Sequence, residues 1–347
     1  MPTLDLYAIG NALVDQEFSI DDAFLGLYQL NKGTMHLSDG LNQQLMADRL
    51  NDHTTPAGVA GGGSAANTAF AVAALGSTVF YACRVGNDAL GDFYLKDLAA
   101  AGVQTSPLSR GLGQTGTCLV MVSPDGERTM HTHLGITTDL SSEQVDATRF
   151  QHAAMLYIEG YLASSPSARA AVIQLRAQAR EQQTKIALSL SDPSMVVHCR
   201  EGLLDLLGDG VDILFCNEEE ARLFSDRLDI NDAIAELHRF SRVVVVTMGA
   251  NGALIGQRNV GERPEEAVGL IQPVSAQTVV DVVDTNGAGD AFAGGFLYGL
   301  SQNFTLSDCG LLASLIAAAV VQQYGPRLPR DQYQQILQGM VNQSATF

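Results

Sequence analysis

Basic residues are scarce in this sequence. Its 347 residues include 20 Lys and Arg against 38 Asp and Glu, which gives a formal net charge of -18. A nucleic acid or an anionic membrane surface needs a basic face to offset phosphate repulsion. We therefore expect neither as a partner, and an anionic small substrate would have to be held by local hydrogen-bond donors.

Cysteine pairs and long apolar segments are also lacking. The five cysteines show no CxxC spacing, which favours neither a zinc site nor a disulfide framework and fits a reducing compartment. The first ten residues have no basic stretch followed by an apolar core, so no signal peptide is expected. The longest apolar run, residues 311–321, is too short to span a bilayer and predicts a buried helix. Together these features predict a cytoplasmic protein.

What the sequence does contain is enough apolar material for a large core, with 46% hydrophobic residues. After residue 154, short apolar strands alternate with amphipathic helices. Strands are predicted at 155–158, 185–190, 213–216 and 243–247, and helices at 167–182, 218–224, 231–240 and 331–342. This alternation predicts an α/β fold with a mostly parallel central sheet flanked by helices on both faces.

A second, smaller sheet is predicted from a hairpin. Residues 117–122 and 128–133 are strand-like and are joined by Ser-Pro-Asp-Gly, in which Asp-Gly favours a tight turn. A hairpin alone is marginal in water, so we expect it to pair with strand-like pieces in 16–37. The prediction is a single domain over residues 1–347, with a discontinuous β lid roughly at 15–38 plus 114–136.

Two stretches in the N-terminal part place polar groups near a predicted ligand edge. Asp15 follows a short strand at 6–9, and ligands bind outside the carboxyl ends of strands in open α/β sheets. Glycines 61–63 precede an alanine-rich helix that carries Asn67 and stops near Gly76. Taken alone, Asp15 is more simply a turn aspartate, and the glycines a flexible loop, so these alternatives stay open.

The most informative stretch is Asp-Val-Val-Asp-Thr-Asn-Gly-Ala-Gly-Asp-Ala-Phe at 281–292. It predicts an apolar strand, a glycine turn, a carboxylate and a helix over 291–300. Free backbone N–H groups of Gly287, Ala288 and Gly289 at a helix start can bind an anion. Asp290 beside them is either an acid–base group or an ordinary helix-start acid. In the helix, Phe292 and Phe296 share one face, and two glycines leave room for a close neighbour.

These motifs resemble the two signatures of the ribokinase-like PfkB carbohydrate and nucleoside kinases. The residues that carry the resemblance are Gly62-Gly63 with Asn67, the stretch Val-Gly-Asn-Asp-Ala-Leu-Gly at 85–91, and Asp-Thr-Asn-Gly-Ala-Gly-Asp at 284–290. They follow the family's order over nearly the whole chain. The sequence has no GxxxxGK[ST] motif, so a P-loop is not available for phosphate binding, and this agrees with the family.

The resemblance implies roles for individual residues. Asp290 matches the catalytic base, and Gly287, Ala288 and Gly289 match the anion hole. The positions that hold the sugar hydroxyls correspond to Asp15, Gly62, Gly63 and Asn67. On the ATP side, the family's NxxE motif corresponds to Asn217 through Glu220, with Glu220 acting on Mg²⁺ through water, and its glycine turn to Thr247, Gly249 and Gly252. Asp284 matches a position tied to a monovalent cation, which would be K⁺.

The substrate is less clear than the reaction. The asparagine in Asp-Thr-Asn-Gly, the Ser-Ala-Ala-Asn after the glycines and the Ser-Pro-Asp-Gly-Glu-Arg turn resemble the bacterial adenosine-kinase-like branch. Arg128 would then act as a charge clamp over the phosphates, with a solvated hairpin arginine as the alternative. Glu159, past a strand end, is a candidate substrate contact.

The resulting expectation is an ATP-dependent enzyme that phosphorylates the primary hydroxyl of a ribosyl group, in adenosine or another purine nucleoside. A sugar kinase acting on ribose or fructose is the alternative, and a catalytically silent small-molecule sensor on the same fold is another. The sequence leaves monomer and homodimer both open.

Overall fold

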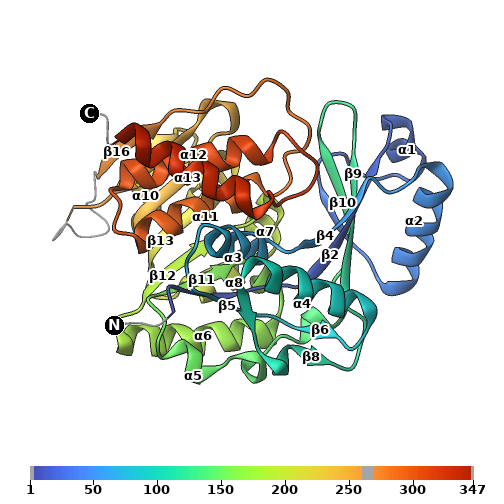
Figure 1. The fold of residues 1–347 in the computed structure, drawn as a ribbon, viewed down its shortest axis with the longest axis horizontal. Helices are drawn as coiled ribbons and strands as arrows, with labels where there is room; N and C mark the ends of the chain where they lie inside the picture. Colours follow the sequence, from blue (N-terminus) through green and yellow to red (C-terminus); the bar gives the residue numbers. More distant parts are fainter. Residues whose placement is uncertain (1–3, 260–268, 345–347) are drawn as a thin grey trace.

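The computed structural model describes residues 4–259 and 269–344 and contains two principal sheets (Figure 1). The large sheet has nine strands in the order β16-β15-β14-β13-β12-β11-β1-β5-β7. Its strands are β1 (Leu6–Ile9), β5 (Val79–Ala82), β7 (Val103–Thr105), β11 (Met155–Glu159), β12 (Lys185–Ser189), β13 (Val211–Asn217), β14 (Ser241–Thr247), β15 (Ala253–Gln257) and β16 (Leu270–Val274). The pairings from β7 to β14 are parallel, and β15 and β16 add antiparallel strands at one edge.

Helices cover both faces of the large sheet, as predicted. One face packs against α3 (Ser64–Ala74), α4 (Ala89–Ala101), α11 (Ala288–Ser301), α12 (Leu306–Val320) and α13 (Arg330–Ser344). The other packs against α5 (Ala147–Phe150), α6 (Pro166–Gln182), α7 (Pro193–His198), α8 (Arg200–Leu207), α9 (Glu218–Ser225) and α10 (Ile230–Leu237). The apolar run at 311–321 lies almost wholly within α12, with Leu312, Ile316 and Val320 buried. Among the described residues, no helix is both long and apolar enough to span a membrane.

The small sheet has five strands in the order β3-β10-β9-β2-β4. They are β2 (Leu13–Ser19), β3 (Met35–Leu37), β4 (Gly58–Gly62), β9 (Gly116–Val122) and β10 (Arg128–His133). The predicted hairpin is β9 and β10, and it pairs with β2 and β3 as expected. A further short pair joins β6 (Val85–Gly86) to β8 (Arg110–Gly111).

The outer face of the small sheet is covered by α1 (Asp22–Leu27) and α2 (Gly40–His53), seen at the right of Figure 1. Phe18 and Met121 of the sheet are buried against Met46 and Leu50 of α2. Sequence analysis predicted neither α2 nor β4. The buried face of α2 consists only of Gln43, Met46 and Leu50, so its periodic signal is weak.

The prediction of an apolar strand before the glycine turn is wrong. Residues 275–287 form no strand, and Val280 and Val282 are 86% and 57% exposed. The backbone N–H of Val283 donates instead to the carbonyl of Val321 at the end of α12, at 2.8 Å. This segment is therefore fixed by a helix end, because no strand of the large sheet lies beside it to form a ladder.

Two adjacent glycines allow α11 to lie deep in the core, as predicted. A Cβ on Gly294 would lie 2.6 Å from the Cβ of Ala71 in α3, and one on Gly295 would lie 2.9 Å from the Cα of Ala313 in α12. On the sheet side, the Phe296 ring packs edge-on against Phe215, with ring centroids 5.5 Å apart. The middle of α11 is thereby held between two helices and the sheet.

Replacing Gly294 with valine should lower the free energy of unfolding by about 1–3 kcal/mol, because the new side chain would overlap α3. Denaturant unfolding followed by circular dichroism measures this. Gly339→Ala in α13 is the matched control, since a Cβ there meets nothing within 4 Å, and it should leave stability unchanged or raise it. Equal losses in both variants would contradict close packing at Gly294.

Candidate active site

A cavity of about 1260 Å³ lies between the carboxyl edge of the large sheet and the inner face of the small sheet. It is lined by Asn11, Glu159, Ser189, Asn217 and Thr247, which end or follow β1, β11, β12, β13 and β14. The small sheet contributes Asp15, Cys118, Arg128 and Met130. All the predicted site residues line the cavity except Gly62, Gly252, Asp284 and Ala288. The carboxyl edge of a parallel sheet is thus a cavity wall, as expected for this architecture.

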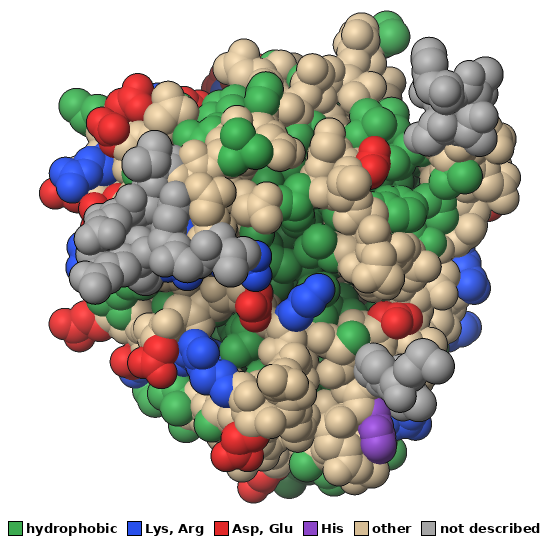
Figure 2. Space-filling view, turned by 90° about the vertical axis from the view of Figure 1, so that its left-hand side faces the viewer, with side chains coloured by type: hydrophobic (Ala, Val, Ile, Leu, Met, Phe, Trp, Pro, Cys, Tyr) green, Lys and Arg blue, Asp and Glu red, His purple; other side chains and the backbone are tan. Residues whose placement is uncertain are grey.

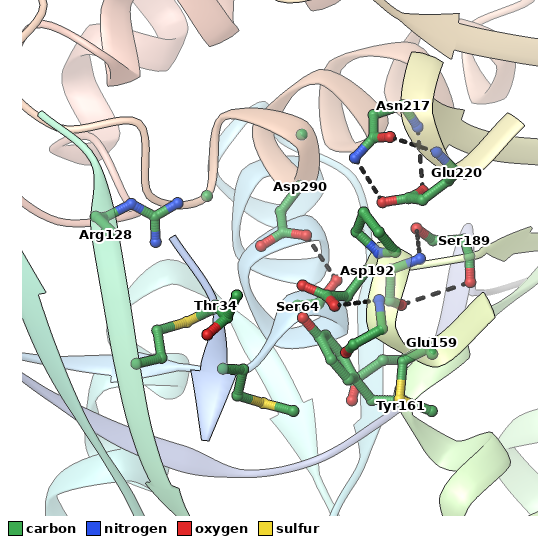
Figure 3. Close-up of a pocket in the computed structure, with 18 of the residues that line it drawn as sticks. Thr34, Ser64, Arg128, Glu159, Tyr161, Ser189, Asp192, Asn217, Glu220 and Asp290 are labelled. Atoms are coloured by element: carbon green, nitrogen blue, oxygen red, sulfur yellow. Dashed lines mark hydrogen bonds between the residues drawn. The ribbon is translucent and has the colours of Figure 1, made fainter. Parts of the chain in front are cut away.

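Asp290 projects into the cavity from the first turn of α11 (Figure 3). Its Oδ1 accepts a hydrogen bond from Ser64 Oγ at 2.6 Å, and its Oδ2 accepts one from Asn67 Nδ2 at 2.9 Å. Burial raises the pKa of Asp290, and these two hydrogen bonds oppose the shift by stabilising the carboxylate. Both donors come from α3, so the carboxylate is oriented by a neighbouring helix and does not cap its own.

The start of α11 leaves backbone donors facing the cavity. Gly287 is the N-cap with φ of 70°, and the first helical bond runs from Ala291 N to Gly287 O at 2.8 Å. A Cβ on Gly287 would lie 2.4 Å from Pro326, whereas one on Gly289 would meet nothing within 4 Å. Packing therefore requires glycine at 287, while space remains open above Gly289. Ala288 N makes a long bond of 3.3 Å to Thr285 O.

The triple glycine before α3 is packed against charged and polar groups of the chain itself. A Cβ on Gly61 would lie 2.7 Å from Arg327 NH1, and one on Gly62 would lie 2.2 Å from Asp15 Oδ1. Gly63 has φ of 91°, and a Cβ there would approach the Asn11 carbonyl at 2.3 Å. The three positions thus exclude side chains so that β4 can pass close to Asp15 and Arg327.

A buried group of charges joins the small sheet to the loop before α11. Burial raises the pKa of Asp15 to about 7 and that of Glu17 to about 7. Arg128 of β10 lies with its Nε 3.1 Å from Asp284 Oδ1, and its NH1 donates to Asn286 Oδ1 at 2.9 Å. Figure 3 shows Arg128 reaching from the small sheet towards this loop.

Asp284 is fully buried and its oxygens are already engaged. Oδ1 accepts from Asn286 N at 2.8 Å and Oδ2 from Gly325 N at 3.1 Å, in addition to the Arg128 contact. A carboxylate with these partners does not fit direct ligation of a monovalent cation, because a guanidinium already supplies the positive charge. No step below depends on such an ion.

Glu159 lies at the base of the cavity and is fully buried. Its Oε1 accepts from Asn11 N at 3.2 Å and Asn11 Nδ2 at 2.8 Å, and its Oε2 accepts from Ala65 N at 2.8 Å. Burial raises its pKa to about 7. Glu159 therefore ties the loop after β1 to the start of α3.

The NxxE motif forms a capping box at the start of α9. Asn217 Oδ1 accepts from Glu220 N at 2.8 Å, and Asn217 N and Nδ2 donate to Glu220 at 3.1 and 2.7 Å. Glu220 is buried, which raises its pKa to about 8. Across from it, Thr247 and Gly249 line the cavity, while Gly252, with φ of 86°, turns the chain behind them.

Two residues of this site were missed in the sequence. Ser64 was considered only as part of the Ser-Ala-Ala-Asn stretch that opens the helix, although a serine three residues before Asn67 could have indicated a contact with the same ligand edge. Arg327 was not considered, and it donates from Nε to Asn67 Oδ1 at 3.0 Å. Nothing in a single sequence links a turn between α12 and α13 to a helix 260 residues earlier.

The fold and site together define a ribokinase-like kinase. The profile of the pfkB family carbohydrate kinases matches residues 39–332. A probable sugar kinase from Rhizobium etli CFN 42 superposes with a TM-score of 0.89 at 36% identity, covering 98% of this chain and 100% of that one. An adenosine kinase from Sinorhizobium meliloti gives a TM-score of 0.88 at 34% identity, covering 97% and 99%.

In sequence, this chain is 28% identical over 341 residues to the adenosine kinase of Saccharomyces cerevisiae, covering 95% of this chain and 98% of the yeast enzyme. The chain belongs to the pfkB family of carbohydrate kinases. It is an ATP-dependent kinase that acts on a hydroxyl group of a small molecule.

The buried carboxyl of Glu17 makes a testable contribution to pH dependence. Its folded-state pKa is raised from 4.5 to about 7, so the folded chain holds a proton that the unfolded chain has released. The free energy of unfolding should therefore fall as pH rises through this window, by up to about 1.4 kcal/mol per pH unit for this group. Glu17→Gln should make that fall shallower, as measured by urea unfolding at several pH values.

Asp125→Asn is the control for this measurement. A hydrogen bond from Lys32 lowers the pKa of Asp125 to about 2, so this carboxyl takes up its proton below the window. The slope of stability against pH should stay as in the wild type. A slope unchanged by Glu17→Gln would contradict the raised pKa.

Proposed function

We propose that this kinase phosphorylates the primary hydroxyl of a ribosyl group, in adenosine or another purine nucleoside. The observation that supports it most is the placement of Asp290. Its carboxylate is oriented by Ser64 and Asn67, lies beside open backbone N–H groups of α11 and faces a cavity large enough for two ligands. Pockets for one drug-sized ligand usually enclose about 300–1000 Å³, so the volume suits a nucleoside and a nucleotide together.

In this proposal Asp290 is the general base. Each of its oxygens already accepts one hydrogen bond, and a carboxylate oxygen can accept two, so a lone pair remains for the substrate hydroxyl. The hydroxyl oxygen forms the new bond to the γ-phosphorus as its proton passes to Asp290. The bond between the γ-phosphorus and the β–γ bridging oxygen breaks, and ADP leaves with that electron pair.

The N–H groups of Gly287, Ala288 and Gly289 are proposed to stabilise negative charge on the transferring group. Of these, Gly289 has the most open approach, and the long Ala288 bond would be the easiest to exchange for a phosphate contact. Arg128 bonds Asn286, directly before Gly287, and would add a positive charge beside these N–H groups by releasing Asp284. Because Arg128 links the small sheet to the loop before α11, this exchange would accompany closure of the small sheet as a lid.

Mg²⁺ is proposed to act through water near Glu220. Both oxygens of Glu220 are held by Asn217, so direct ligation would break the capping box, whereas a bound water would not. Within the described ranges, no group of three or more His, Cys, Asp or Glu side chains is placed to hold a metal ion. The fit is therefore to an ion held mainly by the nucleotide, where it neutralises phosphate charge. Thr247, Gly249 and Gly252 would lie along the nucleotide.

The small sheet supports a nucleoside rather than a bare sugar. Its inner face presents apolar side chains to the cavity: Leu13, Met35, Cys118, Met130 and the nearby Leu134. A flat purine base can be bound by such a wall, since binding pockets are mostly apolar with few polar groups. Asp15 and Asn67 line the same cavity and can hold a vicinal diol. Glu159 would support this arrangement by its bonds to Asn11 and Ala65.

A sugar kinase is the second candidate, favoured by the relative from Rhizobium etli.

On the face shown in Figure 2, acidic and basic side chains are interspersed without a continuous basic patch, which agrees with a small-molecule substrate.

Asp290→Asn tests the proposed base. It should lower kcat by about 100- to 10,000-fold while ATP still binds, because the amide cannot take the proton. Asp308→Asn in the first turn of the adjacent α12 is the matched control, since Asp308 bonds only within its own cap. A folded Asp290→Asn variant with full turnover would show that the base lies elsewhere.

A panel of adenosine, inosine, guanosine, ribose and fructose tests the substrate class. Adenosine or another purine nucleoside should give the highest kcat/KM, with ADP formation coupled to consumption of the nucleoside. Met130→Asp, which places a charge on the apolar wall, should weaken nucleoside use more than any sugar use. Activity confined to free sugars would replace the nucleoside proposal with the sugar kinase.

A further inference from the structure

Arg327 is a buried arginine that the proposed reaction does not use. It lies in the turn between α12 and α13, with a side chain only 6% exposed. Its guanidinium is paired with Asp97 of α4, lies 4.9 Å over the Phe70 ring and points NH2 at the Gly62 carbonyl at 3.4 Å. Its remaining donor, Nε, bonds to Asn67 Oδ1 at 3.0 Å. A buried charge that bonds to a residue of the active site suggests that it contributes to that site.

The chemistry of this contact fixes the Asn67 amide in one orientation. A guanidinium can only donate hydrogen bonds, and an ionised carboxylate can only accept them. Asn67 lies between the two, so its oxygen must face Arg327 and its NH2 group must face Asp290. The reversed amide would set NH2 against a guanidinium and an oxygen against a carboxylate, losing both bonds.

The same turn supports the anion-binding helix start. Gly325 N donates to Asp284 at 3.1 Å, and Pro326 packs so closely on Gly287 that no Cβ would fit there. Arg327 is the next residue. Residues 325–327 therefore contact the loop before α11, the N-cap of α11 and Asn67, the partner of Asp290. This segment thus fixes the Asp290 carboxylate and the phosphate-facing N–H groups relative to each other.

We propose that Arg327 is a positioning residue for phosphoryl transfer. By bonding Asn67 Oδ1 it holds the Asn67 NH2 group on Asp290 Oδ2, and this decides which lone pairs of Asp290 face the substrate hydroxyl. Asp97 balances its charge at the outer end. The inference rests on the proposed role of Asp290 as the base, and it assigns Arg327 no contact with substrate or nucleotide.

A double-mutant cycle between Arg327 and Asn67 tests this role. Arg327→Met should lower kcat by about 10- to 100-fold with KM for ATP little changed, as expected when an outer partner of a reacting group is lost. Asn67→Ala should remove the same orientation directly. The double variant should then be no slower than Asn67→Ala alone, within about twofold, because both changes break one interaction.

The pH profile separates positioning from a purely structural effect. Burial raises the pKa of Asp290, and the positive charge of Arg327 is one of the groups that oppose this rise. Loss of this charge should move the acid limb of the kcat profile to higher pH. Arg327→Lys keeps the charge beside Asp97 but lacks the planar fork, so it should restore the acid limb while leaving most of the kcat loss. If Arg327→Met fails to fold, Arg327→Lys replaces it in the double-mutant cycle with Asn67→Ala.

Arg176→Met is the matched control, since Arg176 is a similarly buried arginine on α6 that bonds to the Asp205 carbonyl far from the cavity. It should lower thermal stability without shifting the pH profile. Multiplicative losses in the double variant, or an unchanged kcat in folded Arg327→Met, would overturn the proposal. Asp290→Asn is measured in parallel to distinguish failure of the Arg327 proposal from failure of the proposed role of Asp290. Retained turnover in Asp290→Asn would show that Asp290 is not the base.

Discussion

The structure must bury negative charge where a polyphosphate has to bind. Asp15 and Asp290 line the cavity, Asp284 is buried in the loop before α11, and the chain as a whole is strongly acidic. Arg128 and Arg327 enter this region from opposite sides, one paired with Asp284 and the other linked through Asn67 to Asp290. With so few cations available, the partial positive charge and open N–H groups at the start of α11 become the main donors for an incoming phosphate. The placement of α11 therefore governs the site.

Glycines make that placement possible, each for a local reason. Gly294 and Gly295 let α3 and α12 approach α11 closely, and Gly287 provides the left-handed N-cap beside Pro326. Gly62 leaves room for Asp15. These contacts lie within the chain, so most of these glycines serve close packing of the protein against itself. Gly289, with nothing near its missing Cβ, is the exception and leaves space for a ligand.

The sequence predicted the parts whose signals are local. Apolar strands and amphipathic helices after residue 154, the Asp-Gly hairpin and the motif around Asp290 were all visible. They yielded the fold and a set of site residues most of which line the cavity. The segment at 281–283 misled because its valines are apolar, although a contact with the end of α12 fixes it and leaves Val282 exposed. Helix α2 and Arg327 escaped because their roles depend on contacts with residues distant in the chain. Such contacts leave no periodic trace in one sequence.

Each sheet holds only part of the chemistry. The small sheet carries Asp15, the apolar wall and Arg128, whereas Asp290, the helix start and the capping box belong to the large one. The Arg128 contact with Asp284 and Asn286 joins them in the structure without any ligand. A phosphate at the start of α11 would compete with Asp284 for the Arg128 guanidinium. The hydroxyls of a diol would donate hydrogen bonds to Asp15. Because Asp15 is destabilised as an anion by burial, a substrate hydroxyl that donates to it also favours its ionised form. In the proposed reaction, substrate binding and the relative position of the sheets would thus be coupled through Arg128 and Asp15.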